Sequence, residues 1–566
     1  MNEHEEPRIG VFVCHCGVNI GSVVNVPEVV ECAKALPNVV HAEGNLYMCS
    51  SEGLSRIKEA IVKCQLNRVV VASCTPRTHE PLFRVACEEA GLNKYLFHMA
   101  NIREHCSWVH SHEPKKATEK AKEIIRMAVA KAALLKPQTE PEIDVEPSAL
   151  VIGGGVAGMT AALNLANQKF TVHLVEKENE LGGRLKELYK LYPTDNYASE
   201  VLKEFVQAVR SNVNIRVYTS ATVKQVEGFI GNFKVTVNHE WKEETLDVGT
   251  IIVATGSDVL KPYKMYGYGE YANVFTQLEL EKLLKDKKLG KPKNVVMIQC
   301  VGAREEKEGG RAYCSRICCS VAVKNAIHIK ELNPETEVYI LYRDMETYGK
   351  DFEEYYRKAR ENFVQFIKYD VENPPEILTR PDGKLTVRVR DVLINATVEL
   401  DTDLLVLSVP LIPREEADEL SKILKVPLGP YGFFLEAHVK LRPVDFATDG
   451  IYVCGTAHSP KTISESIAQA YAAASRASIP MALRRIRTEA ITAFVNEDLC
   501  TGCGTCIKLC PYNAIQKDEK GIAKVNEVLC KGCGLCAASC PEKAIDMRHF
   551  SDAQVLAEAT AVLGGT

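Results

Sequence analysis

Residues 149–158, ALVIGGGVAG, form an apolar strand that runs directly into a glycine-rich turn. Gly153, Gly155 and Gly158 make the pattern GxGxxG where the strand ends and a helix is expected. In such a turn the first glycine permits the sharp change of direction, the second lets a pyrophosphate approach the backbone, and the third lets the helix pack on the strand. The next strand ends at Glu176, where a carboxylate can bind ribose hydroxyls. These residues predict a dinucleotide site at a helix N-terminus.

Three further segments resemble the FAD-contacting segments of the thioredoxin-reductase-like flavoproteins. They are LGGR at 181–184, TIIVATG at 250–256 and DGIYVCGTA at 449–457. Thr456 stands where that family usually has Asp, so a hydroxyl would replace the usual contact to the ribityl chain. The resemblance implies a FAD site made by Gly153, Gly155, Gly158, Glu176, Gly183, Arg184, Ala254, Thr255, Gly256, Gly455 and Thr456.

Residues 294–324, NVVMIQCVGAREEKEGGRAYCSRICCSVAVK, begin where the same family has its second nucleotide-binding domain. The strand is present, but the turn after it lacks GxGxxG. Thiolates are soft ligands that suit iron–sulfur clusters and zinc, whereas packed structural thiols are the alternative. We interpret this segment as a metal cluster in place of a nicotinamide site, with four candidate ligands: Cys300, Cys314, Cys318 and Cys319.

The C-terminal part contains the pattern CxxCxxCxxxCP twice, at 500–511 and at 530–541. In bacterial two-cluster ferredoxins the first three cysteines of each run bind one [4Fe–4S] cluster and the fourth binds the other. Two tetrahedral zinc sites would not account for eight ligands with this spacing. The expected ligand sets are Cys500, Cys503, Cys506 and Cys540 for one cluster, and Cys530, Cys533, Cys536 and Cys510 for the other.

The N-terminal part alternates apolar strands with helical patterns, which suggests a small α/β domain with a parallel sheet. Ligand sites in such sheets lie beyond the carboxyl ends of the strands. Four cysteines fall at such ends and could hold one more cluster: Cys14, Cys16, Cys49 and Cys74. Cys32, Cys64 and Cys87 fall in helical patterns, where packing is expected, and Cys106 fits either role.

Composition supports a multidomain globular protein with large cores, since 46% of the 566 residues are hydrophobic and 25% are charged. The net charge of −5 with no long basic run argues against nucleic acid as a partner. The acidic N-terminus lacks a secretory pattern, and the longest apolar run is broken by glycines, so we expect a cytoplasmic protein without a transmembrane segment. In that compartment the 21 cysteines indicate metal ligands more than disulfides.

We expect six segments. They are an N-terminal Cys-bearing α/β domain at 1–136, a linker at 137–147, the first part of the FAD-binding domain at 148–290, a modified nucleotide-binding domain at 291–400, the second part of the FAD-binding domain at 401–487 and a 2[4Fe–4S] ferredoxin domain at 488–566.

This order of parts resembles the A-type subunit of heterodisulfide reductase, an iron–sulfur flavoprotein. The segments VCHCGVNI, YMCS, ASCTPRTHEPLF and CGTAHSPKTISES carry the resemblance along with the Cys300/Cys314/Cys318/Cys319 motif. It implies a [4Fe–4S] cluster near the flavin and a lysine at the flavin's reactive edge, here Lys324, whose ammonium would stabilise reduced flavin. An exposed helix lysine is the alternative.

The resemblance also implies an oxidoreductase component for flavin-based electron bifurcation or confurcation, in methanogenesis or related sulfur metabolism. Electrons would pass between a two-electron donor of the hydrogenase or formate dehydrogenase type, ferredoxin, and B- and C-type heterodisulfide reductase subunits. A homodimer within a larger complex is expected.

Some members of that family carry an extra ferredoxin domain after the first FAD segment, whereas this chain has no cysteine between Cys106 and Cys300. A second hypothesis is therefore a non-bifurcating component that only relays electrons. A third is an NAD(P)H-dependent flavin oxidoreductase, against which the missing second GxGxxG and the missing CxxC disulfide pair argue.

Overall fold

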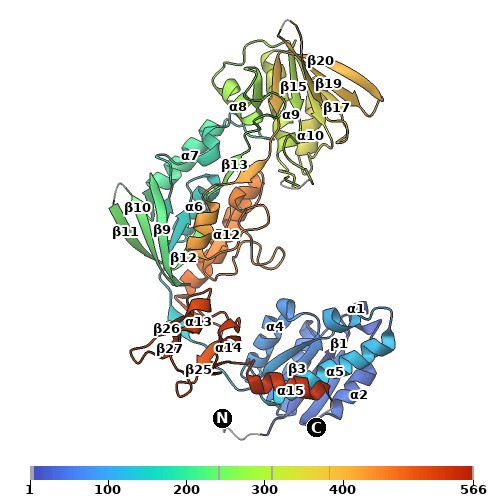
Figure 1. The fold of residues 1–566 in the computed structure, drawn as a ribbon, viewed down its shortest axis with the longest axis vertical. Coiled ribbons are helices and arrows are strands. Elements are labelled where there is room, and N and C mark those ends of the chain that lie inside the picture. The colour runs from blue at the N-terminus through green and yellow to red at the C-terminus, as the bar shows by residue number, and fades with distance from the viewer. Residues whose placement is uncertain (1–5, 240–241, 307–309, 382, 564–566) are drawn as a thin grey trace. The chain divides into compact units, whose positions relative to one another are not determined.

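The computed structural model describes residues 6–239, 242–306, 310–381 and 383–563 (Figure 1). The chain forms two compact units. One contains Met1–Glu142 together with Arg487–Thr566, and the other contains Ile143–Ile486.

The N-terminal part of the first unit is a four-stranded parallel sheet in the order β2-β1-β3-β4. Every residue of β1 is buried, as expected for a parallel strand covered by helices on both faces. The predicted α/β fold is thus confirmed. The strands are β1 (Ile9–Cys14), β2 (Val39–Asn45), β3 (Arg68–Ser73) and β4 (Phe97–Asn101), and the main helices are α2 (Val26–Lys34), α3 (Ser51–Lys63), α4 (Pro76–Glu89) and α5 (Pro114–Ala133).

The C-terminal part of the first unit has the internal symmetry of its sequence repeat. Gly504 (φ 79°) and Gly534 (φ 75°) precede the short helices α13 (Thr505–Leu509) and α14 (Leu535–Ala538), at backbone angles that favour glycine. The short strands pair as β25 (Ala493–Val495) with β28 (Ile545–Met547) and β26 (Ile515–Lys517) with β27 (Ala523–Val525). The last helix, α15 (Asp552–Val562), packs along α5 (Figure 1).

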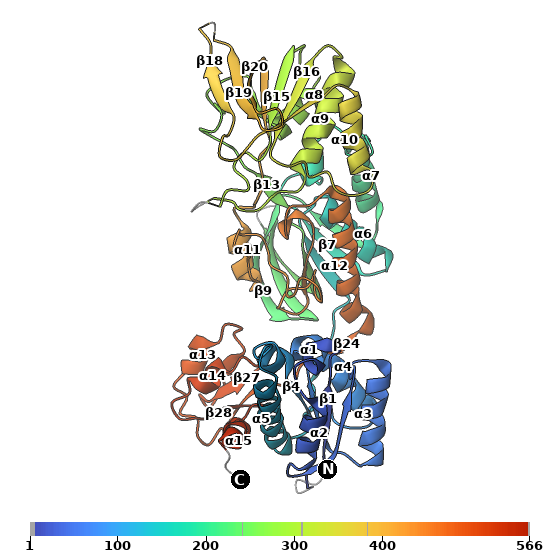
Figure 2. The same ribbon diagram turned by 90° about the vertical axis from the view of Figure 1, so that its right-hand side faces the viewer.

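The second unit begins with a five-stranded parallel sheet in the order β23-β12-β6-β7-β8. Helices α6 and α12 pack against each other beside this sheet (Figure 2). A three-stranded antiparallel sheet, β11-β10-β9, occupies the 221–250 segment. The elements are β6 (Ser148–Ile152), α6 (Val156–Asn167), β7 (Thr171–Val175), α7 (Ala198–Ser211), β8 (Ile215–Tyr218), β9 (Ala221–Phe229), β10 (Asn232–His239), β11 (Lys242–Val248), β12 (Thr250–Val253), α11 (Ala417–Leu424), β23 (Ile451–Val453) and α12 (Ile463–Leu483).

A second parallel sheet, β14-β21-β15-β16-β17, forms the body inserted into this scaffold. It includes strands from both sides of the expected 291–400 segment, because β14 pairs with β21 and β21 pairs with β15. The inserted body therefore extends beyond those bounds. Its elements are β14 (Val274–Thr276), α8 (Gln277–Lys285), β15 (Asn294–Ile298), α9 (Cys318–Leu332), β16 (Glu337–Tyr342), α10 (Phe352–Glu361), β17 (Gln365–Lys368), β18 (Glu376–Thr379), β19 (Leu385–Asp391), β20 (Ala396–Thr402) and β21 (Leu404–Leu407).

Two further observations concern segments outside these sheets. A short strand, β5 (Glu142–Asp144), forms within the expected 137–147 linker. Among the described residues, no helix combines the length and the apolar character that crossing a membrane requires.

Candidate flavin and iron–sulfur sites

The second unit contains a cavity of about 730 Å³ that reaches from the first glycine turn to the start of α9. Nine of the eleven residues expected to contact FAD line it: Gly153, Gly155, Glu176, Gly183, Arg184, Ala254, Thr255, Gly256 and Thr456. The other two glycines, Gly158 and Gly455, do not line the cavity but lie in the packed layer next to it. A Cβ on Gly158 would stand 1.8 Å from the Gly153 carbonyl oxygen, and one on Gly455 would stand 2.8 Å from the Ala157 Cβ. Their role is close packing, which no larger residue permits.

The first glycine turn leaves open space next to Gly155, its second glycine, where a phosphate group can lie. Gly153 adopts φ +109°, where a Cβ would lie 2.4 Å from the Ala254 carbonyl oxygen. Gly155 instead faces open space, since the nearest atom to its Cβ position is the Gly183 Cα at 4.0 Å. The turn leads into α6, whose first backbone N–H groups have no side-chain cap. An uncapped helix N-terminus beneath an open glycine floor fits the pyrophosphate of FAD.

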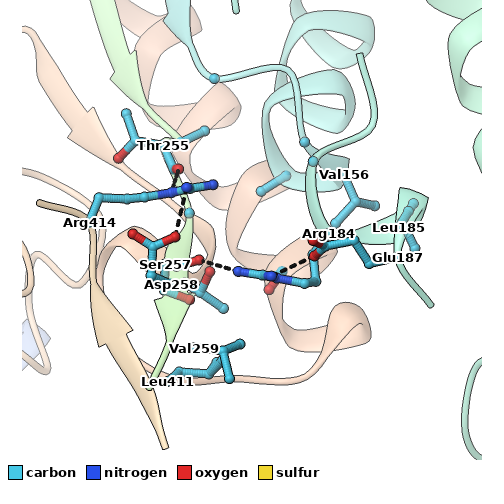
Figure 3. Close-up of a pocket in the computed structure, with 18 of the residues that line it drawn as sticks. Val156, Arg184, Leu185, Glu187, Thr255, Ser257, Asp258, Val259, Leu411 and Arg414 are labelled. Atoms are coloured by element: carbon cyan, nitrogen blue, oxygen red, sulfur yellow. Dashed lines mark hydrogen bonds and ion pairs between the residues drawn. The ribbon is translucent and has the colours of Figure 1, made fainter. Parts of the chain in front are cut away.

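Hydrogen bonds to backbone groups fix two charged side chains that line the cavity, Glu176 and Arg184. The Gly154 N–H donates to Oε2 of Glu176 at 2.6 Å, and the Glu178 N–H donates to its Oε1 at 2.9 Å. Arg184 donates to the Ser257 carbonyl at 2.8 Å (Figure 3). A carboxylate fixed in this way can receive ribose hydroxyls without reorganising.

The third flavin segment brings a buried lysine to the cavity. Lys461 lines the cavity beside Thr456, and its Nζ donates to the Gly455 carbonyl at 3.0 Å. Burial lowers the pKa of Lys461 to about 8. Thr462 and Glu465 form a capping box at the start of α12, the capping role that their sequence positions suggest.

Lys324 lines the same cavity from α9, and it is not an exposed helix lysine, since it is only 1% exposed. Its Nζ donates to the Lys190 carbonyl at 2.8 Å and forms an ion pair with Glu281 of α8. Burial lowers the pKa of Lys324, and the charge of Glu281 opposes this shift. The cavity therefore contains a buried ammonium–carboxylate pair at the end nearest the cysteine motif.

The four thiols of this motif lie close enough to influence one another. Cys318 and Cys319 open α9, and Cys318 lines the cavity. Burial raises the pKa of Cys318, and the charges of Cys319, Cys300 and Cys314 add to this rise. Burial likewise raises the pKa of Cys319 to about 12. Charge on several neighbouring buried thiolates would require a compensating cation, as in a metal cluster.

The donor set is chemically suited to an iron–sulfur cluster. All 21 cysteines are free thiols. Within the described ranges, no three His, Cys, Asp or Glu side chains gather as ligands of one metal ion would. In a cubane cluster each thiolate binds a different iron, so the four sulfurs need not converge on one point. The residues present thus fit a [4Fe–4S] group.

In the C-terminal part, one small cavity is lined by the first expected ligand set, Cys500, Cys503, Cys506 and Cys540. The fourth residue comes from the other half of the repeat, as ligand sharing between the halves requires. The Ala544 N–H donates to the Cys540 sulfur at 3.3 Å, and the Ala514 N–H donates to the Cys510 sulfur at the same distance. In the second set, Cys536 lies close enough to Cys530 and Cys533 for their charges to raise its pKa, although burial contributes more.

The four N-terminal candidates meet at the carboxyl edge of the first sheet. Cys14 ends β1, and Cys74 follows β3 directly. Burial raises the pKa of Cys14, and the charges of Cys16 and Cys49 add to it. Burial likewise raises the pKa of Cys74 to about 11, with smaller contributions from Cys16 and Cys14.

Cys64 and Cys87 pack in the core of this domain, whereas Cys32 is partly exposed. Cys32 lies on α2, Cys64 follows α3, and Cys87 lies fully buried on α4. The Cys106 thiol donates to the Ala117 carbonyl at 3.0 Å, which accounts for this residue as a structural one.

Three residues near these sites were not predicted from the sequence. Arg103 donates to the Cys16 sulfur at 3.4 Å, Glu281 pairs with Lys324, and Gln299 lies buried directly before Cys300. Only Gln299 carried a local signal, as a polar residue at the end of an apolar strand.

Comparison with known proteins defines the class first. Residues 147–477 match the family model of the pyridine nucleotide-disulphide oxidoreductases, and residues 493–547 match the 4Fe-4S dicluster domain. The chain is therefore a flavoprotein-type oxidoreductase scaffold joined to a dicluster ferredoxin domain, which confirms the predicted fold class. The chain is also similar to thioredoxin reductase from Lactococcus lactis, with a TM-score of 0.43 and 18% identity over 59% of this chain and 99% of that one.

Full-length relatives define the family. The chain is 43% identical to the A-type subunit of H(2):CoB-CoM heterodisulfide,ferredoxin reductase from Methanothermobacter marburgensis, over 99% of this chain and 98% of the relative. It is 38% identical to the A-type subunit of H(2)/formate:CoB-CoM heterodisulfide,ferredoxin reductase from Methanococcus maripaludis, over 91% of this chain and 92% of the relative. The chain belongs to the family of heterodisulfide reductase A-type subunits, as its motifs predict, and it is an electron-transferring oxidoreductase component of the flavin and iron–sulfur type.

Proposed function

We propose that the chain carries one FAD and four [4Fe–4S] clusters and distributes electrons within a heterodisulfide-reductase-type complex. Two clusters belong to the C-terminal repeat, one to the Cys300/Cys314/Cys318/Cys319 motif, and one to Cys14, Cys16, Cys49 and Cys74. When bound, FAD supplies two-electron chemistry, and each cluster carries one electron at a time. Disulfide reduction is assigned to a partner of the B/C type, because this sequence carries no heterodisulfide-cleaving cysteine motif.

One observation carries this proposal. The cavity lined by the FAD-type glycine turns also contains Cys318 and Lys324. In the related oxidoreductases the inserted domain binds a nicotinamide nucleotide at a glycine turn, but here the turn after β15 carries Cys300. A thiol quartet next to the flavin cavity gives the flavin a metal partner in place of a nicotinamide. The Cys300 motif is then the flavin's electron port, which means the cluster through which electrons enter or leave the flavin.

The chain's own residues prepare this cavity for charge transfer. Lys324 holds its ammonium within the buried end of the cavity, and Glu281 balances that charge when no negative group is near. Thr456 and Lys461 line the wall formed by the third flavin segment. A fixed cation in a water-poor cavity favours the reduced, more negative form of a flavin.

The names of the relatives suggest partners for the same reaction. They mention hydrogen, formate and ferredoxin. For this chain we propose a donor of the hydrogenase or formate dehydrogenase type, ferredoxin and B- and C-type subunits, with a homodimer at the centre of the complex.

Bifurcation or confurcation is the finer form of this proposal. The alignment with the Methanothermobacter relative spans 649 positions, more than the 566 residues of this chain, so that relative contains residues that this chain lacks. The chain would then reach external ferredoxin through fewer clusters than such relatives. A simple relay of electrons is the second candidate, and the shorter chain favours it.

Metal and flavin analysis of the purified full-length protein tests the main proposal. About 16 irons and one FAD per chain are expected, four irons for each of four clusters. A content of about 12 irons per chain would show that the N-terminal cysteines hold no cluster. A content of about 8 would show that the Cys300 motif holds none either and that its cysteines only pack. Rapid flavin bleaching by NADPH in the isolated protein would instead favour the nicotinamide-dependent alternative.

A redox titration of the bound flavin separates bifurcation from relay. Crossed one-electron potentials, with the second electron easier to add than the first, are expected for bifurcation. Well-separated potentials in the normal order would overturn it and leave the relay.

A further inference from the structure

Gln299, the residue directly before Cys300, has a buried side-chain amide with no partner. The residue is 1% exposed, and neither Nε2 nor Oε1 makes a hydrogen bond to any described residue. Its backbone, in contrast, is fully used. Its N–H donates to the Leu341 carbonyl at 2.9 Å, and its carbonyl accepts from the Tyr369 hydroxyl at 2.8 Å. Because burying an amide without partners costs free energy, such groups are rare, and a water molecule, an ion or a cofactor is the usual partner where the chain supplies none.

Strand geometry places the Gln299 amide on the same face of the sheet as the cysteines at the start of α9. Side chains alternate between the two faces of a strand, and the ladder bond from the Gln299 N–H continues the pairing of β15 with β16. Gln299 therefore shares a face with Met297, which packs with Ala322 and Val323 of α9. Helix α9 opens with Cys318 and Cys319. The unpaired amide of Gln299 thus lies on the face of the sheet that α9 covers, and Gln299 is followed directly by Cys300.

A second unpaired donor lies near the same thiol. Arg343 follows β16, the neighbour of β15, and its Nε is buried without a partner among the described residues. Its Nη1 donates to the Arg304 carbonyl at 3.2 Å. Arg343 stands two residues after Leu341, whose carbonyl accepts the Gln299 N–H. A buried guanidinium N–H and a buried amide, both without partners among the described residues, fit a negatively charged group from outside the chain.

We propose that the Gln299 amide donates a hydrogen bond to the cluster held by the Cys300 motif and thereby raises its reduction potential. This inference rests on the proposed function, which puts a cluster at that motif. A hydrogen bond to a cluster sulfur stabilises the reduced state, because that state carries more negative charge. The Arg343 guanidinium acts in the same direction as a fixed positive charge.

The first test measures the potential directly. Gln299→Met keeps a similar side-chain volume and removes the donor. In full-length protein with its clusters, an EPR-monitored titration should show a lower potential for this cluster, equivalent to about a tenfold weaker reduction equilibrium, or 59 mV. The signal is identified as the one missing from Cys318→Ser. In Gln299→Glu, which donates only when protonated, the potential should depend on pH. An unchanged potential in Gln299→Met with full iron content would overturn the inference.

The second test uses the metal-free protein, where the amide has nothing to bind. There Gln299→Met should unfold at an equal or higher urea concentration than the parent, because the orphan group is gone. Gln277→Met is the matched control. Gln277 is also buried, but its amide bonds to Ser408 and Asn325, so the same change should lower the midpoint. Equal losses in both variants would mean that Gln299 has protein partners and would overturn the inference.

Failure of the proposed function would look different. If Cys318→Ser retained all of the parent's iron, the Cys300 motif would hold no cluster, whatever Gln299 does. If Cys318→Ser lost about four irons while Gln299→Met kept its potential, only the role of Gln299 would fall.

Discussion

The thiols beside the flavin cavity and those of the C-terminal repeat share one ligand type but differ in how many of them are exposed to water. Cys319 is buried, whereas Cys503 and Cys533 are exposed. Burial raises the pKa of Cys319 to about 12, whereas hydrogen bonding to Thr505 lowers the pKa of Cys503. Both sets are mixed, since Cys300, Cys314 and Cys318 are partly exposed and Cys506 and Cys536 are buried, but only the C-terminal set contains exposed thiols.

In the proposed function, the Cys300 motif is the internal electron port and the C-terminal thiols are the external one. Of the Cys300/Cys314/Cys318/Cys319 motif, Cys318 lines the flavin cavity and Cys319 is buried, which suits electron exchange with a flavin bound there. Exposed thiols at the rim of a small domain allow a partner's redox centre to approach closely. The two sets therefore suit different tasks in the same path, and the following changes test this.

The largest expected effect is the loss of the internal port. Cys318→Ser should bind FAD normally but lose about four irons and should no longer exchange electrons between flavin and complex. Cys503→Ser should also lose irons, while flavin and the internal cluster still exchange electrons. Iron and flavin content together with stopped-flow flavin reduction make the measurement. Normal flavin reduction through the complex in Cys318→Ser would contradict the assignment.

The next effect concerns the ion pair at the internal end of the cavity. Lys324→Met leaves Glu281 buried without its cation, because both side chains are almost fully buried. The free energy of unfolding should fall by about 3–5 kcal/mol, measured by urea titration. The double variant Lys324→Met/Glu281→Leu removes both charges and should recover most of this loss. An equal loss in the double variant would show that packing, rather than charge, accounts for the effect.

Sequence predicted the scaffold well because its signals are local. The strand, glycine turn and acid around Gly153 and Glu176 occupy adjacent elements, and fully buried parallel strands read as short apolar runs. The two-cluster repeat is equally local. The limits of the inserted body could not be predicted from local signals, because β14 (Val274–Thr276) and β21 (Leu404–Leu407) have the same apolar character as other core strands. Only their pairing assigns them to the second sheet.

The candidate site shows the same division between local and long-range information. The cysteines could be named from spacing, but the environment of Lys324 could not. Its partner Glu281 lies 43 positions earlier, on another helix, so no helical periodicity links them. Arg103 reaches Cys16 across 87 positions in the same way. Contacts of this kind depend on how elements pack, which single-sequence patterns do not record.

A smaller effect distinguishes the C-terminal part by its response to pH. His549 is buried, and burial lowers its pKa to about 3, helped by the charges of Lys131 and Arg84. The unfolded histidine has a pKa of about 6.5, so between pH 6.5 and 3 the unfolded state binds a proton that the folded state does not. Stability should therefore be present above pH 6.5 and fall as pH drops, by up to about 1.4 kcal/mol per pH unit.

His549→Gln should weaken this dependence in the first unit and leave the second unit unchanged. Urea titrations of the full chain at pH 7 and pH 5, followed by hydrogen exchange of each unit, provide the measurement. His98 lies beside His549, and burial also lowers its pKa, so part of the dependence should remain. A pH response of the same size in the variant would exclude His549 as its source.

The smallest effect concerns one hydroxyl at the external port. The Cys503 thiol donates to the Thr505 hydroxyl at 3.5 Å, and the same hydroxyl can donate to the thiolate, which lowers the pKa of Cys503. In metal-free protein, Thr505→Val should return this pKa toward its usual value and slow alkylation of Cys503 severalfold near neutral pH, because the thiolate is the reactive form. Thr501→Val, in the same loop, is the matched control and should leave the rate unchanged. Mass spectrometry of each cysteine gives the rates, and buried Cys319 should stay unmodified throughout. Equal rates in both threonine variants would show that exposure alone, without the hydroxyl, makes the external thiols reactive.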